Sequence, residues 1–122
     1  MKKATFAKFP KRLRIGAYDM SVVIMENQFD DGGQSYLWGD FDSNAMCIRV
    51  ASKLPSGVVP DGVTAVATFL HEVLHAVWFS SSLRTGDDEE RQVDTVSNAL
   101  TQILRDNPAV LPWIAANLKG RA

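Results

Sequence analysis

The sequence predicts an α+β fold, in which a small N-terminal antiparallel sheet is followed by a central helix and one or two further helices. In the first half of the chain, short apolar runs and apolar–polar alternation are separated by turn residues, a pattern typical of strands. In the second half, apolar residues recur every three or four positions, a pattern typical of helices packed on a core. A chain of 122 residues is expected to form a single domain, residues 1–122, with a core of its own.

The strands of this sheet follow one another closely. Leu13 and Ile15 alternate with charged residues, residues 16–19 read as a turn, and an apolar run spans residues 22–25. Two more strands are expected in QSYLWGDF and AMCIRVAS, with a tight connection at residues 42–44 between them.

The central helix is expected to start at Asp61, which can cap it, and to run to about Phe79. Its apolar residues cover most of the circumference, so it should be buried on most sides. A second, amphipathic helix is expected over residues 87–106. Asn107-Pro108 ends it, and a third helix through Leu118 follows if Pro112 is tolerated within it.

Composition narrows the class of protein. The formal net charge is -1 and the hydrophobic content 46%, which fits a globular protein and gives no general reason to expect a nucleic acid or an anionic membrane as partner. Six basic residues precede the first acid, Asp19, so residues 1–10 are expected to form a basic, solvated N-terminal arm that does not bind nucleic acid. The lysines are not followed by a long apolar run, and the longest apolar segment is interrupted by charged and histidine residues. We therefore expect neither a signal peptide nor a membrane span, and a cytoplasmic location.

The two histidines of the chain, His71 and His75, lie four residues apart on the central helix. This spacing places both imidazoles on one face, one turn apart, where they can meet one metal ion. Glu72 is offset by about 100° around the helix, so it can reach a water on the metal more easily than the metal itself. The pattern H-E-x-x-H predicts a zinc-bound water that is activated by a general base.

The alternative is that the two histidines share a helix by coincidence. Burying two imidazoles and a carboxylate in an apolar helix is costly unless they have partners, and a metal would be a partner for all three. The helical context therefore favours a metal site.

A catalytic zinc site needs a third protein ligand. No third histidine exists, so that ligand must be a carboxylate or Cys47, the single cysteine. Glu89 and Glu90 share the core-facing side of the second helix, whereas Asp94 lies about 100° from it. Glu90 can instead form a capping box with Asp87, and a cysteine on a strand is more often a small buried hydrophobic residue. These alternatives stay open on the spacing alone.

Three blocks of the chain, WGDFDSNAMCIRV, FLHEVLHAVW and EERQVDTVSNALTQILRDNP, together resemble the small phage-type metallopeptidase-like proteins of the HExxH gluzincin group. The resemblance covers roughly residues 9–108. It implies a minimal zincin-like α+β fold, a phage or prophage origin, and hence the cytoplasm of a bacterial host. It also implies one Zn²⁺ per chain, held by His71, His75 and Glu90, with Glu89 as second choice, and Glu72 as the catalytic base.

The function expected from these features is that of a zinc-dependent metallopeptidase acting on a peptide or protein of unknown identity. In similar peptidases an extended substrate pairs with an exposed strand edge, for which residues 45–51 or 36–41 are candidates. The oxyanion would need a donor, and Tyr18, Tyr36, Arg49 and Arg84 are the choices.

The small size of the chain favours a different class of function. In that alternative the chain is a non-catalytic phage accessory or binding protein with a structural zinc site.

Overall fold

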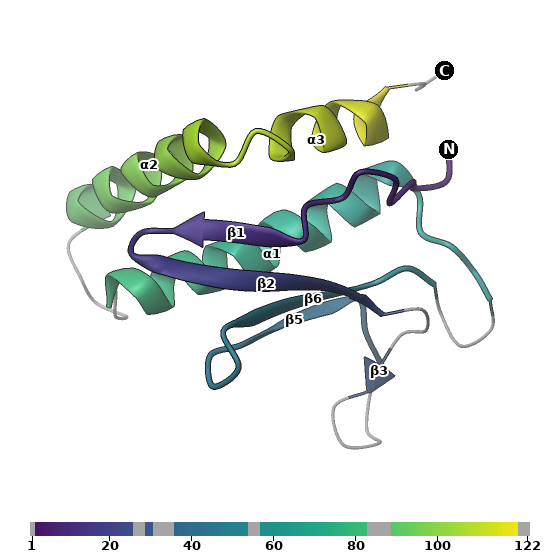
Figure 1. Ribbon diagram of the computed structural model, residues 1–122, viewed down its shortest axis with the longest axis horizontal. Coiled ribbons are helices and arrows are strands. Elements are labelled where there is room, and N and C mark those ends of the chain that lie inside the picture. Colours follow the sequence, from purple (N-terminus) through teal and green to yellow (C-terminus); the bar gives the residue numbers. More distant parts are fainter. Residues whose placement is uncertain (1, 26–28, 31–35, 54–56, 83–88, 120–122) are drawn as a thin grey trace.

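The computed structural model describes residues 2–25, 29–30, 36–53, 57–82 and 89–119. The chain forms a four-stranded sheet followed by three helices, so the predicted α+β class, with the sheet before the helices, is confirmed (Figure 1). The elements are β1 (Arg12–Ile15), β2 (Tyr18–Met25), β3 (Phe29–Asp30), β4 (Tyr36–Leu37), β5 (Gly39–Asp42), β6 (Cys47–Ala51), α1 (Gly62–Ser81), α2 (Glu89–Asp106) and α3 (Val110–Leu118).

The four-stranded sheet has the order β1-β2-β6-β5 and is mixed, whereas a purely antiparallel sheet was expected. The strand pairs β1–β2 and β5–β6 are antiparallel hairpins, but β2 and β6 run parallel. After β2 the chain crosses over before it enters the sheet again, so β6 pairs with β2 on one side and with β5 on the other. Two separate hairpins are thereby joined through one parallel pair, which a reading of local turn signals does not predict. β3 and β4 form a separate two-stranded antiparallel sheet.

One face of the main sheet carries the core. Directly opposed residues share a face, and the pairs Leu13–Met20 and Val22–Ile48 are buried there. α1 packs on this face and contributes its buried apolar side chains to the same core, namely Ala65, Val66, Phe69, Val73, Ala76 and Val77. α1 lies behind the sheet and α2 contacts β1 (Figure 1).

The helix predictions are confirmed with small shifts of their ends. Asp61 caps α1, and its side chain accepts a hydrogen bond from the backbone N–H of Thr64 at 2.8 Å. α2 begins at Glu89, and the expected start at residue 87 lies outside the described residues. α3 forms because Pro112 falls in its first turn, where the missing N–H would have no helical partner anyway.

The N-terminal segment is anchored, although it was expected to be a solvated arm. Its lysines are exposed, but Phe9 is buried and packs edge-to-face against Phe69 and Trp113. Asn117 of α3 accepts from the backbone N–H of Thr5 at 2.9 Å and donates to its carbonyl at 3.1 Å. The start of the chain and its last helix therefore hold each other on the N-terminal half of α1.

α1 is long and apolar enough to cross a membrane by length and composition alone, with a mean hydropathy of 1.3. Core helices of soluble proteins pass the same test, and α1 packs against the sheet and α3 in this structure.

Candidate metal and active site

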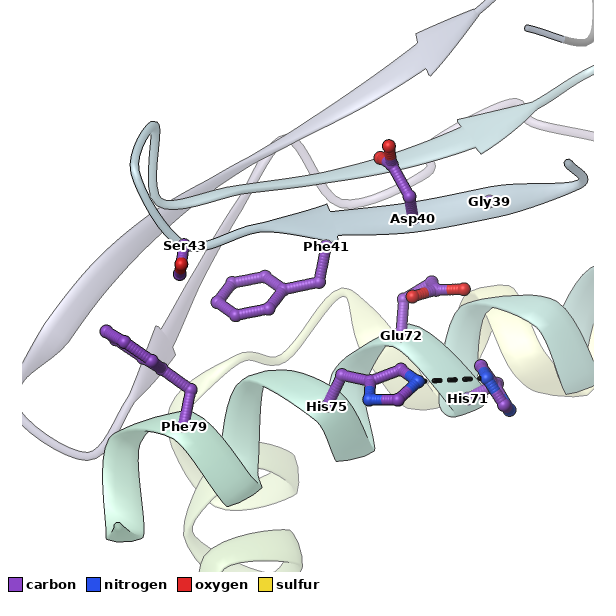
Figure 2. A pocket seen from close by; sticks show the side chains of 8 residues that line it. All are labelled: Gly39, Asp40, Phe41, Ser43, His71, Glu72, His75 and Phe79. Atoms are coloured by element: carbon purple, nitrogen blue, oxygen red, sulfur yellow. Dashed lines mark hydrogen bonds between the residues drawn. The ribbon is translucent and has the colours of Figure 1, made fainter. Parts of the chain in front are cut away.

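α1 brings the two histidines together on a solvent-facing turn. The Nε2 atoms of His71 and His75 lie 3.1 Å apart, and both residues are exposed (Figure 2). The contact is a hydrogen bond when one ring carries its proton on Nε2 and the other does not. The expected placement of both imidazoles on one face of the helix, one turn apart, thus matches the structure, and the expected metal stays a prediction.

The separation of the two nitrogens also fits a shared metal ion. Zinc–nitrogen bonds of about 2.0–2.1 Å at tetrahedral angles place two nitrogen ligands about 3.3 Å apart. The observed 3.1 Å needs only a slight adjustment of the rings. The histidine pair therefore has a geometry and a donor chemistry that suit Zn²⁺.

Glu72 is buried, with an exposed fraction of 6%, on the flank of α1 that faces β5. No described residue forms a hydrogen bond with its carboxyl, yet no side-chain oxygen or nitrogen in the described part is both buried and unpaired. The carboxyl oxygens are therefore accessible from the hollow beside the histidines (Figure 2).

The environment of Glu72 makes its carboxylate a stronger base. Burial raises its pKa above the ordinary value of 4.5; His71 and His75 act in the opposite direction, and the nearby Asp40 adds to the increase. A carboxylate with a raised pKa is a better proton acceptor near neutral pH than an exposed one.

β5 forms the opposite wall of the site and approaches α1 closely because Gly39 has no side chain. A Cβ atom at Gly39 would lie 3.2 Å from Cγ of Glu72, 2.9 Å from Cγ2 of Thr68 and 2.9 Å from the carbonyl oxygen of Arg49. Gly39 therefore permits the spacing between β5 and the Glu72 carboxyl. This role is not evident in the sequence, where Gly39 reads as one more residue of a strand.

The hollow between β5 and α1 has a volume of about 470 Å³, within the usual range for ligand sites. Its lining combines the site residues with an apolar part, and consists of Gly39, Asp40, Phe41, Ser43, His71, Glu72, His75 and Phe79 (Figure 2). A second hollow of about 280 Å³ adjoins His71 and Glu72 towards Trp38, and a third of about 260 Å³ adjoins the histidine pair towards Trp78. The histidine pair thus borders space on several sides.

Asp40 projects from β5 and pairs with Arg49, the residue directly opposite on β6. The Arg49 guanidinium donates to both carboxylate oxygens of Asp40, with 2.7 Å between Nε and Oδ1. Arg49 is therefore engaged and is a poor candidate for the oxyanion donor. The Ser43 hydroxyl lines the hollow and is a donor that sequence reasoning missed, because residues 42–44 were read only as a turn.

The other candidate oxyanion donors are not placed at the site by the described residues. Tyr18 lies beside Phe79, with ring centroids 6.0 Å apart, and does not line the hollow. The Tyr36 side chain and Arg84 lie outside the described part of the chain.

The third metal ligand is not identified by the described residues. Glu89 and Glu90 form the start of α2, but their side chains lie outside the described part. Asp94 is exposed on α2, and no three His, Cys, Asp or Glu residues among those described could hold a metal ion together. Cys47 alternates with the buried Ile48, so it lies on the sheet face opposite α1 and is excluded as a partner of the histidines.

The structure decides between the two proposed strand edges. β6 lies between β2 and β5, so the expectation that residues 45–51 offer a free edge is wrong. β5, which includes part of the other candidate segment, is an edge strand of the main sheet. The Trp38 carbonyl accepts from the Ala51 N–H at 2.7 Å, and inward and outward groups alternate along an antiparallel strand. The backbone groups of Gly39 and Phe41 therefore point away from the sheet, beside the hollow.

Comparison with protein-family models, curated proteins and solved structures finds no match to this chain.

Proposed function

We propose that the protein is a zinc-dependent peptidase that holds one Zn²⁺ per chain. The observation that carries the proposal is the position of the Glu72 carboxyl, which is buried next to two converging imidazoles and opens into the same hollow. A hydrolytic metal site needs a carboxylate next to the metal that is free to accept a proton. A structural metal site has no such requirement.

His71 and His75 are the ligands that would hold the metal, with Glu90 or Glu89 as the third. Bound zinc supplies a Lewis acid that polarises a carbonyl and makes a water acidic enough to attack near neutral pH. Glu72 accepts the proton of the attacking water and passes it to the leaving amine, a task that its raised pKa favours.

The open edge of β5 supports a peptide as the substrate. The outward N–H and C=O groups of Gly39 and Phe41 can pair with an extended chain, which would then lie across the hollow above Glu72. The Ser43 hydroxyl lines the hollow and is our candidate for the donor to the oxyanion.

The experiment compares zinc content and peptide turnover of the wild type with those of three variants. Glu72→Gln should keep zinc and the fold but abolish hydrolysis, because glutamine preserves the shape of the side chain and cannot accept the proton. Glu90→Gln should lose zinc, since it removes a charged ligand; if Glu90 only caps α2, Glu89→Gln should lose zinc instead.

Two results would contradict the proposal. Loss of zinc in Glu72→Gln, with zinc retained in both other variants, would overturn the assigned roles. A wild type that binds one zinc but cleaves no member of a broad peptide library would favour the alternative of a structural metal in a binding protein.

A further inference from the structure

The part of the hollow beyond His75 has an aromatic wall. Phe79 lies one helical turn after His75 on α1, and its ring centroid is 5.7 Å from that of Phe41 on β5 and 6.0 Å from that of Tyr18 on β2. Phe79 is 44% exposed and Tyr18 is 40% exposed. The Phe41 and Phe79 rings thus lie close together at one end of the hollow (Figure 2), and the Tyr18 ring contacts Phe79 from outside the lining of the hollow.

This exposure differs from that of a second group of aromatic residues, which packs against the N-terminal half of α1. Phe6, Phe9, Phe69 and Trp113 form a connected cluster that is closed by the N-terminal segment and α3. An open group of large apolar side chains against a concave surface is typical of a binding site rather than of a core.

We propose that Phe41 and Phe79 form a specificity pocket that takes one large apolar side chain of a peptide bound along β5. The inference rests on the proposed function, and it names the class of substrate. The hollow that the two rings line also contains Glu72 and His75, so an occupant of the rings is at the same time next to the reacting groups.

The position of the rings relative to the edge strand favours a peptide side chain as the occupant. Phe41 directs its backbone groups to the free edge while its ring turns towards α1. A chain paired with that edge alternates its side chains between the two faces, so every second residue points towards α1. One such residue would reach the rings, and burying a phenyl or isobutyl group there removes apolar surface of both partners from water.

The test measures binding without cleavage, so that it does not depend on activity. Zinc-supplemented Glu72→Gln protein is titrated calorimetrically with a blocked pentapeptide that has phenylalanine in the centre of four alanines, and with its all-alanine counterpart. The phenylalanine peptide should bind at least about tenfold more tightly, the usual scale for one apolar group in a pocket. Phe79→Ala in the same background should reduce the ratio of the two affinities to near one, and Phe79→Leu should retain most of it.

A matched control is Leu111→Ala, which removes an apolar side chain of 54% exposure from α3, away from the hollow. This variant should keep the full preference. Equal affinities for the two peptides, failure of both to bind, or a preference that survives Phe79→Ala would overturn the pocket. Loss of self-association in Phe79→Ala, without any peptide preference, would assign the rings to an interface between two copies and would also overturn it.

The two proposals fail in different ways. If the phenylalanine peptide binds through Phe79 but the wild type cleaves no peptide, the pocket stands and the peptidase proposal fails. If the wild type cleaves the alanine and phenylalanine peptides equally well, the peptidase stands and the pocket fails.

Discussion

The two edges of the main sheet differ in whether their outward backbone groups have hydrogen-bond partners. At the β1 edge, the Asn107 side chain accepts from the Arg14 N–H at 2.9 Å and donates to its carbonyl at 3.1 Å, and Gln102 donates to the same carbonyl at 2.8 Å. At the β5 edge, the outward groups of Gly39 and Phe41 have no partner among the described residues. Within the described part of the chain, the β1 edge is therefore closed by side-chain amides, and the β5 edge is open beside the candidate site.

The difference indicates which edge of the sheet is available for pairing with another chain. An unpaired strand edge is a liability, and proteins usually cover or block it. Here the covered edge faces away from the histidines, whereas the open edge borders the hollow that contains them. The open edge is thus the one at which pairing with another chain would be useful.

Among substitutions at the two edges, Gly39→Ala at the open edge is expected to have the largest effect on stability and turnover. The added methyl group would press against the Arg49 carbonyl, Thr68 and Glu72, so it should lower the free energy of unfolding by about 1–3 kcal/mol. It should also lower turnover, because β5 and the Glu72 carboxyl can no longer keep their spacing. Chemical denaturation and peptide turnover measure the two effects.

A second substitution tests whether this effect comes from the close contact. Thr68→Ser removes the Cγ2 atom that lies 2.9 Å from the added methyl group, so it should restore part of the stability lost by Gly39→Ala. Wild-type stability and turnover in Gly39→Ala alone would show that β5 does not need this close approach.

A smaller effect is expected at the closed edge from Asn107→Ala. The change removes the bonds to the Arg14 backbone and one to the Ile103 carbonyl at 2.8 Å, and these groups can turn to water because most of them are exposed. We expect a loss of about 1 kcal/mol in chemical denaturation, with turnover unchanged. Asn98→Ala, an identical change at an exposed position of α2, is the control and should have little effect. Lowered turnover in Asn107→Ala at full zinc content would contradict the separation of the two edges.

Local features of the molecule can be predicted from the sequence, whereas the pairings at its two sheet edges cannot. The helix cap at Asp61 and the convergence of His71 and His75 depend on neighbours three or four residues away, so local spacing is enough to predict them. The closure of β1 by Asn107 joins residues 93 positions apart, and the insertion of β6 beside β2 depends on a crossover. Such pairings are decided by the packing of the whole domain. Gly39 and Phe79 were missed as site residues for the same reason, since each acts through another element.

The smallest expected effect concerns the cost of keeping Glu72 next to the open edge. Burial raises its pKa in the folded protein above the ordinary value of 4.5, so ionisation favours the unfolded chain. This destabilisation is absent at low pH, where the carboxyl is protonated in both states. It grows as the pH rises through 4.5 towards the folded pKa, and it is complete above that value. In the presence of a chelator, Glu72→Gln should therefore unfold at a slightly higher temperature than the wild type at pH 7, and the two melting temperatures should converge near pH 4.

The control is Asp94→Asn, which removes a charge from an exposed residue of α2 and should show no such pH-dependent gain. If Glu72→Gln is instead less stable than the wild type at pH 7 without metal, the buried carboxylate has a stabilising partner. Glu72 is then not available as a general base next to the histidines.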